Sequence, residues 1–218
     1  MKICAVSPWK SPSPEEASAT DILSFLKKAT AELVVLPGVC RNTPSPQKVK
    51  RAIRRGVAVF VEHGRPKRRA TPYLVTSDEI VTMPCQVFYE STPTARCMDQ
   101  LVAVWKCRTF SIGSRKVTFA ICGEINGFNL HGQVKHGRAL PFDILANPVH
   151  RVMGRWQHLR RKLSALSKGK VVIHVANCDR KNPERIKTDV RIYMDGVLKE
   201  DKVQADRRLK LKWCECEI

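Results

Sequence analysis

Cys122 is the residue with the clearest chemical potential, because it follows the apolar run of residues 117–121 and precedes Gly123. A continuous apolar run bounded by turn residues is typical of a strand buried on both faces. A cysteine at the end of such a strand would emerge where the chain leaves the sheet. Gly123 would let a reacting group approach the backbone closely, and amides at the start of a following helix would favour the nucleophilic thiolate. The alternative is a small buried hydrophobic residue, which is how free cysteines are commonly found.

Other polar residues near expected strand ends have simpler interpretations. His174 lies within the apolar run 171–176, which favours a hydrogen-bonded histidine in the interior. His158 lies among arginines on an expected helix, so we expect it to be solvated or packed at an interface. Asn177 follows a buried strand, where asparagine most often satisfies turn backbone.

The remaining cysteines do not form a metal-binding pattern. The chain has nine cysteines, and this odd number favours reduced thiols over a disulfide framework. Cys214 and Cys216 are the only close pair, and no second pair or histidine spacing of the zinc-finger type accompanies them. We therefore expect no metal and no cofactor.

Length and composition indicate one globular domain over residues 1–218. Hydrophobic residues make up 43% of the chain, which is a globular value. No apolar run approaches the length of about 20 residues that spans a bilayer, and the apolar N-terminus is too short for a secretory signal. These features predict a soluble, cytoplasmic protein without a membrane partner.

The net charge of +19 points to an anionic partner such as nucleic acid. The basic residues are spread along the chain and are not interleaved with aromatic residues as in a base-stacking platform. Solvated basic helix faces are the alternative explanation for most of them.

The elements that would position Cys122 alternate between strands and helices, so the fold class is α/β (α+β). The first strand–helix–strand unit predicts parallel strands. The number of strands exceeds what one helix-covered sheet needs, which favours two packed mixed sheets with helices outside. Expected strands are residues 2–6, 32–36, 57–61, 73–75, 79–82, 108–112, 117–121, 142–147, 171–176, 190–194 and an exposed 209–213; expected helices begin at Ser13 and Pro46 and cover residues 101–105 and 156–169.

The order of four segments resembles the nitrilase, or carbon–nitrogen hydrolase, superfamily. The resemblance extends over nearly the full chain. It is carried by residues 32–37, by residues 119–125 around Cys122, by residues 156–166 with 171–177, and by residues 188–196.

This resemblance implies a four-layer α-β-β-α sandwich that often forms homodimers. It also implies hydrolysis of a small-molecule amide or nitrile through a thioester or thioimidate on Cys122. In such enzymes a glutamate acts as general base and a lysine stabilises the oxyanion. Asn177 and Gly123 match positions near the substrate.

The sequence departs from the family at the base and the lysine. Gly38 occupies the position expected for the glutamate, and no lysine occurs in residues 86–90. The nearest lysine is Lys106. Substitute acids are Glu62, Glu90 and Glu124, each of which is also explained as a surface or supporting residue.

Two hypotheses therefore stay open. The first is a divergent carbon–nitrogen hydrolase of reduced activity with Cys122 as nucleophile. The second is a catalytically inactive protein of the same fold whose basic surface binds an anionic partner. Without a base, a thiol with a pKa of about 8.5 is only a few per cent ionised at neutral pH.

Overall fold

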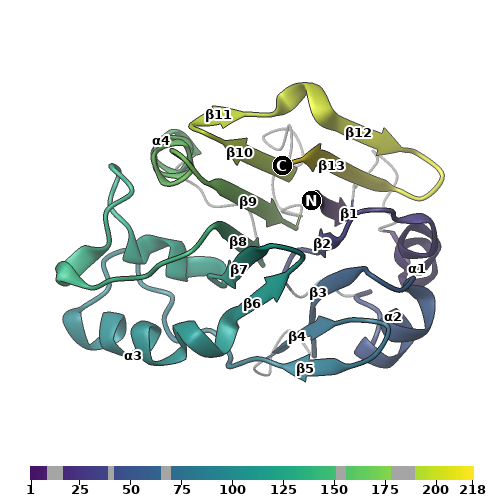
Figure 1. Cartoon of the computed structure of the whole chain (residues 1–218), viewed down its shortest axis with the longest axis horizontal. Helices are drawn as coiled ribbons and strands as arrows, with labels where there is room; N and C mark the ends of the chain where they lie inside the picture. The colour runs from purple at the N-terminus through teal and green to yellow at the C-terminus, as the bar shows by residue number, and fades with distance from the viewer. Residues whose placement is uncertain (9–16, 39–41, 65–69, 151–155, 178–189) are drawn as a thin grey trace.

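Two β-sheets pack face to face between two pairs of helices. The computed structural model describes residues 1–8, 17–38, 42–64, 70–150, 156–177 and 190–218. Figure 1 shows the helices α1 and α2 on one side of the molecule and α3 and α4 on the other, with the N- and C-termini side by side between them. The expected α-β-β-α sandwich is confirmed.

The first sheet has seven strands in the order β12-β13-β1-β2-β3-β4-β5. The strands β1, β2 and β3 are parallel, as the strand–helix–strand pattern predicted, and the outer pairs are antiparallel. The strands are β1 (Lys2–Pro8), β2 (Leu33–Val35), β3 (Ala58–His63), β4 (Thr71–Val75), β5 (Ile80–Thr82), β12 (Val203–Asp206) and β13 (Leu211–Glu217).

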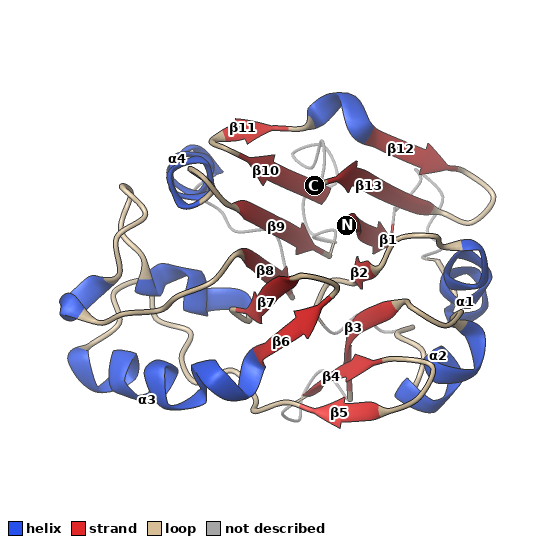
Figure 2. Ribbon diagram, in the orientation of Figure 1, coloured by secondary structure: helices blue, strands red, loops and turns tan. Residues whose placement is uncertain are grey.

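The second sheet has six strands in the order β11-β10-β9-β8-β7-β6, and its central strands β7, β8 and β9 are parallel. Figure 2 shows the two sheets as separate groups of strands. The strands are β6 (Thr109–Ile112), β7 (Arg115–Phe119), β8 (Ile144–Val149), β9 (Val171–Ala176), β10 (Val190–Met194) and β11 (Val197–Leu198).

The four helices are α1 (Ala19–Lys28), α2 (Pro46–Ala52), α3 (Ala95–Trp105) and α4 (Trp156–Leu166). Each turns an apolar stripe toward a sheet, for example Ile22 and Leu26 on α1. Ser18 caps α1 by accepting the Asp21 N–H, and Asp21 in turn accepts the Ser18 N–H. The helix start expected at Ser13 lies outside the described residues.

Strand alternation builds three apolar layers. In β1, Ile3 and Ala5 point into the layer between the sheets, whereas Cys4 and Val6 point toward α1 and α2. A third apolar layer joins the six-stranded sheet to α3 and α4. Both faces of the central strands are therefore covered, which explains their continuous apolar sequences.

Three expected elements differ from the structure. The C-terminal strand β13 is not exposed; it pairs with both β1 and β12, and its residues Leu211 and Cys214 are fully buried. Strand β8 continues through Pro148 to Val149, because the parallel strand β9 pairs with it as far as Val149. Helix α3 begins at Ala95, six residues earlier than expected, after a Thr94 cap.

None of the helices in the described part of the chain is both long and apolar enough to pass through a lipid bilayer.

Candidate active site

The carboxyl ends of the central parallel strands of both sheets converge at one end of the sandwich. The Gly38 N–H donates to the Val149 carbonyl oxygen at 3.2 Å, which links the end of β2 to the end of β8. Asn177 Nδ2 donates to the Gly38 carbonyl oxygen at 2.7 Å. The side chain of Ser7 donates to the Ala176 carbonyl oxygen at 2.7 Å, joining β1 to β9. Cys122 lies at the same end of the sandwich because it follows β7, the parallel neighbour of β8.

Cys122 occupies a strained backbone position. It is partly exposed and has a φ of 49°, in the left-handed region that non-glycine residues seldom adopt. It begins a short 3-10 helix, Cys122–Gly127, three residues after β7 ends at Phe119. Such a conformation persists only where surrounding contacts impose it, and these positions cluster at functional sites.

Asn147 on β8 imposes part of this conformation. Its Nδ2 donates to the carbonyl oxygens of Ala120 at 2.6 Å and Cys122 at 3.1 Å. Its Oδ1 accepts from His174 Nδ1 at 2.8 Å. Burial lowers the pKa of His174 to about 3, so this imidazole stays neutral and holds the asparagine in one orientation. His174 is thus the hydrogen-bonded interior histidine that the sequence favoured.

Lys162 on α4 supports the far end of the 3-10 helix. Its ammonium group donates to the Ile125 carbonyl oxygen at 3.1 Å and to Asn126 Oδ1 at 3.2 Å. Removal from water lowers the pKa of this lysine to about 8. We call the turn formed by residues 121–127 the elbow. Lys162 therefore contacts the end of the elbow that is distant from Cys122.

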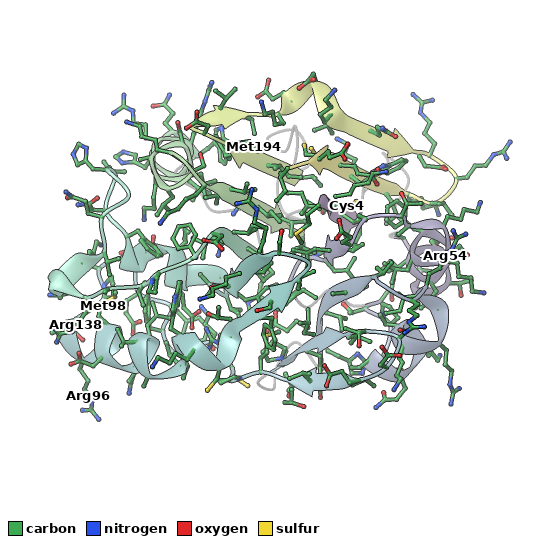
Figure 3. The ribbon with its side chains drawn as sticks, viewed as in Figure 1. Cys4, Arg54, Arg96, Met98, Arg138 and Met194 are labelled. Carbon is green, nitrogen blue, oxygen red and sulfur yellow. The ribbon has the colours of Figure 1, made fainter. Side chains whose placement is uncertain are left out.

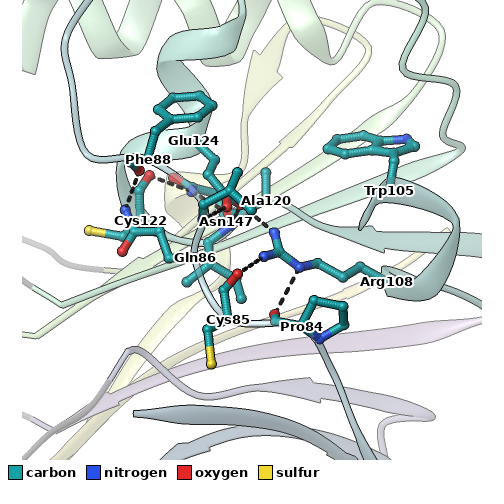
Figure 4. Close-up of polar contacts among 12 residues, drawn as sticks. Pro84, Cys85, Gln86, Phe88, Trp105, Arg108, Ala120, Cys122, Glu124 and Asn147 are labelled. Carbon is teal, nitrogen blue, oxygen red and sulfur yellow. Dashed lines mark hydrogen bonds and ion pairs between the residues drawn. The ribbon is translucent and has the colours of Figure 1, made fainter. Parts of the chain in front are cut away.

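Glu124 forms a buried ion pair with Arg108 (Figure 4). Its carboxylate accepts the Ile121 N–H at 2.8 Å, the Val87 N–H at 2.7 Å and the Arg108 guanidinium at 2.5 Å. Burial raises the pKa of the Glu124 carboxyl, and the guanidinium opposes that rise. With both oxygens occupied, this carboxylate holds the elbow against the preceding loop.

A different carboxylate reaches the thiol through a histidine. His150, directly beyond β8, has Nε2 at 2.7 Å from Glu62 Oε2 on β3. Cys122 is the second side chain that interacts with this ring. The thiol and then the carboxylate raise the pKa of His150 to about 10. The Glu62 side chain is 3% exposed and that of His150 is 32% exposed, so the ring reaches from the interior to the partly open side of Cys122.

Gly38 makes room for His150. A Cβ atom at position 38 would lie 2.4 Å from His150 Cδ2, 2.9 Å from its backbone nitrogen and 3.0 Å from Glu62 Oε2. Contacts this short do not occur between such atoms, so any residue with a side chain at position 38 would displace the histidine. The glycine that removes the expected glutamate therefore admits an imidazole–carboxylate pair.

The other candidates from the sequence lie around the elbow in different roles. Lys106 is exposed where α3 passes into a 3-10 turn, and among the described residues no hydrogen bond joins it to Cys122. Glu90 is exposed and its carboxylate accepts the neighbouring Tyr89 N–H at 2.9 Å. Gly123 admits the Tyr89 backbone, since a Cβ there would lie 3.0 Å from the Tyr89 carbonyl oxygen.

His150 was missed by the sequence interpretation, although a signal existed. It follows the apolar run that ends near Asn147, and carboxyl ends of neighbouring parallel strands meet at one edge of a sheet. A histidine beyond one such strand and a cysteine beyond the next are therefore close. Which other group faces them depends on the second sheet and is not evident from spacing.

Comparison with known proteins establishes the fold. Neither a protein-family model nor a curated protein matches the sequence. The glutamine-dependent NAD(+) synthetase from Cytophaga hutchinsonii superposes with a TM-score of 0.60 at 11% identity over all of this chain. This chain spans only 43% of that synthetase.

Two similar structures match the chain over most of their own length. The CN-hydrolase superfamily protein XC1258 from Xanthomonas campestris has a TM-score of 0.56 at 14% identity, covering 99% of this chain and 90% of its own. A mutant of the amidase from Nesterenkonia sp. AN1 has a TM-score of 0.56 at 12% identity, covering 100% and 93%. This chain therefore has the fold of the nitrilase, or CN-hydrolase, superfamily.

Proposed function

We propose that this protein is a cysteine-dependent hydrolase of carbon–nitrogen bonds other than peptide bonds. The observation that carries the proposal is the position of Cys122, which is partly exposed on a strained elbow and faces an ionisable ring. Its sulfur would bond to the carbonyl carbon of an amide as the C–N bond breaks and the amine leaves. Water would then cleave the thioester, releasing the acid and restoring the thiol.

The structural neighbours give this proposal support of a general kind. The amidase from Nesterenkonia sp. AN1 is described with acrylamide added to its active-site cysteine, and XC1258 with an arsenic adduct in its active site. Both proteins have the fold of this chain.

Selective alkylation tests whether Cys122 is a nucleophile. With iodoacetamide at pH 7, we expect Cys122 to be modified much faster than Cys107, an exposed cysteine that serves as internal reference. Hydrolysis of a panel of simple amides and nitriles should be lost in Cys122→Ala and kept in Cys107→Ala. Equal labelling of the two thiols, or unchanged hydrolysis in Cys122→Ala, would overturn the proposal.

A second candidate function is binding of nucleic acid by a basic surface. The last turns of α1 and α2 lie together, because Arg54 Nε donates to the Lys27 carbonyl oxygen at 3.1 Å. The exposed cations at these helix ends are Lys27, Lys28, Arg51, Arg54 and Arg55. Counterion release would make binding fall steeply with salt. Retention of a labelled RNA or DNA by Arg51→Ser/Arg55→Ser at the wild-type level would count against it.

The family resemblance also implies a face-to-face homodimer, which we propose as the assembly. Analytical ultracentrifugation checks it: a single species of monomer mass at micromolar concentration would remove this part of the proposal.

A further inference from the structure

We propose that His150 is the acid–base residue of this site, oriented by Glu62, in the space that Gly38 leaves open. This inference rests on the proposed function. In place of a carboxylate base at the end of β2, the site has an imidazole that follows β8. A carboxylate on β3 orients this imidazole, and the nucleophile follows β7.

The His150 ring has a short contact with Glu62 and lies beside Cys122. Nε2 is bound to Glu62 at 2.7 Å, so that carboxylate does not occupy the other ring nitrogen. Cys122 is the other titratable side chain that interacts with the ring. Asn147 fixes the relative position of the two strand ends, because it is on β8 three residues before His150 and binds the Cys122 carbonyl oxygen at 3.1 Å. The three groups are thus arranged as nucleophile, imidazole and carboxylate.

The surroundings of His150 determine the charge of its ring at rest. Among the described residues, the titratable groups that face the ring are Cys122 and Glu62, and both favour the protonated imidazole. With its pKa raised to about 10, His150 is cationic at neutral pH. A cationic imidazole next to a cysteine favours the thiolate over the thiol, and the thiolate is the reactive nucleophile.

The reaction then balances without another base. The Cys122 thiolate forms the S–C bond, and the C–N bond breaks as His150 gives its proton to the leaving nitrogen. The neutral imidazole next takes a proton from water as the water oxygen attacks the thioester carbon. Breakage of the S–C bond restores the thiolate and the protonated ring, while Glu62 takes no part in the proton transfers and acts as a positioning residue.

The test is the pH profile of Cys122 alkylation by iodoacetamide in the full chain. In the wild type we expect a high rate that changes little between pH 6 and 8. In His150→Gln the rate at pH 7 should fall roughly 20- to 50-fold, since an unassisted thiol is only a few per cent ionised there, and should then climb with pH. His158→Gln, on the exposed face of α4, is the matched control and should keep the wild-type profile.

Two further variants separate chemistry from folding. Glu62→Gln keeps a hydrogen-bonding partner for the ring but removes the negative charge of that partner. The pH range over which the alkylation rate stays constant should therefore end at a lower pH than in the wild type. Gly38→Ala changes none of the reacting groups, yet its Cβ should push the ring away and slow alkylation as His150→Gln does. Circular dichroism at 25 °C confirms that each variant is folded before its rates are compared.

The outcomes distinguish the two proposals. If Cys122 of the wild type reacts no faster than Cys107, the hydrolase proposal itself fails. If it reacts fast and His150→Gln keeps the same rate and the same flat profile, only the assignment of His150 is overturned. A fast wild type with a slow, pH-dependent His150→Gln supports both.

Discussion

Two carboxylates lie near Cys122, each paired with a basic side chain, and the pairs differ in what surrounds them. In the first, Arg108 and Glu124 are both fully buried, and the Glu124 oxygens accept from two backbone amides as well as the guanidinium. In the second, Glu62 is buried but the His150 side chain is 32% exposed. The His150 ring also interacts with the thiol of Cys122. The first pair fixes the elbow, and the second can exchange protons.

The difference follows from the chemistry of the two cations. A guanidinium cannot release a proton in a protein, so the Arg108 pair can only hold geometry. An imidazole changes charge readily, and its proton is accessible here because the ring is partly open. A carboxylate near a cysteine is therefore assigned a role by its partner and its exposure, not by its distance along the chain.

The largest expected effect comes from breaking the buried pair. Arg108→Met leaves the Glu124 carboxylate buried without its cation, and should lower the free energy of unfolding by about 3–5 kcal/mol. Urea unfolding followed by circular dichroism measures this. Arg96→Met, at an exposed position on α3 that points away from the molecule in Figure 3, is the control. A loss in Arg108→Met no larger than in this control would show that the two pairs do not differ as we describe.

A second prediction concerns the neutral histidine behind the elbow. The folded protein binds a proton at His174 only near pH 3, whereas the unfolded chain binds one near pH 6.5. The unfolded state therefore gains the proton first as pH falls. We expect stability to drop below about pH 6.5, by at most about 1.4 kcal/mol per pH unit. The free energy of unfolding, measured with urea at pH 7, 6 and 5, should fall less steeply with decreasing pH in His174→Gln than in the wild type. An equal dependence on pH in the two proteins would contradict this prediction.

The third prediction concerns His150, whose contribution to stability decreases as pH rises, the opposite of His174. Its folded pKa of about 10 exceeds the value in the unfolded chain, so its stabilisation is fully present below about pH 6.5 and is lost as pH rises through about 10. Lys162 titrates in the same range with the reverse sign, because its pKa is lowered to about 8. The comparison that isolates His150 is wild type minus His150→Gln in thermal melts from pH 6.5 to 10. A constant difference across that range would argue against the ion pair.

The smallest effect is expected at a third pair, Arg138 with Asp99. Their side chains are 39% and 58% exposed, so solvent screens the 2.7 Å contact. Arg138→Ala should leave the urea midpoint unchanged within error. A clear loss of stability there would mean that burial does not rank these pairs.

The apolar segments of the sequence were sufficient to predict the strands of the parallel core. Val117 and Phe119 lie in the layer between the sheets, and β7 covers Arg115–Phe119, so it ends two residues before the end that the pattern predicted. The neighbouring expected strands 108–112 and 117–121 correspond to the antiparallel hairpin of β6 and β7, which turns at Gly113. The C-terminal strand was misjudged because its alternation of basic and apolar residues does not reveal that a neighbour covers each edge.

Cys122 was predicted from the sequence, whereas its neighbour His150 was not. Cys122 could be proposed from its place after an apolar strand, since that depends on local order alone. The departure at Gly38 was evident too, but its consequence was not, because the atom that would collide with a side chain belongs to His150, 112 positions later in the chain.

The sequence by itself determined which strands are buried on both faces and where a cysteine leaves the sheet, because hydrophobic periodicity and turn residues act over short spans. Only the tertiary structure decided that Glu124 holds the turn at Cys122 in place and that Glu62 binds His150. Glu62, Cys122 and His150 come from three strands in two sheets, and their contact arises from the packing of those sheets. Distances set by packing have no counterpart in the spacing of residues along the chain.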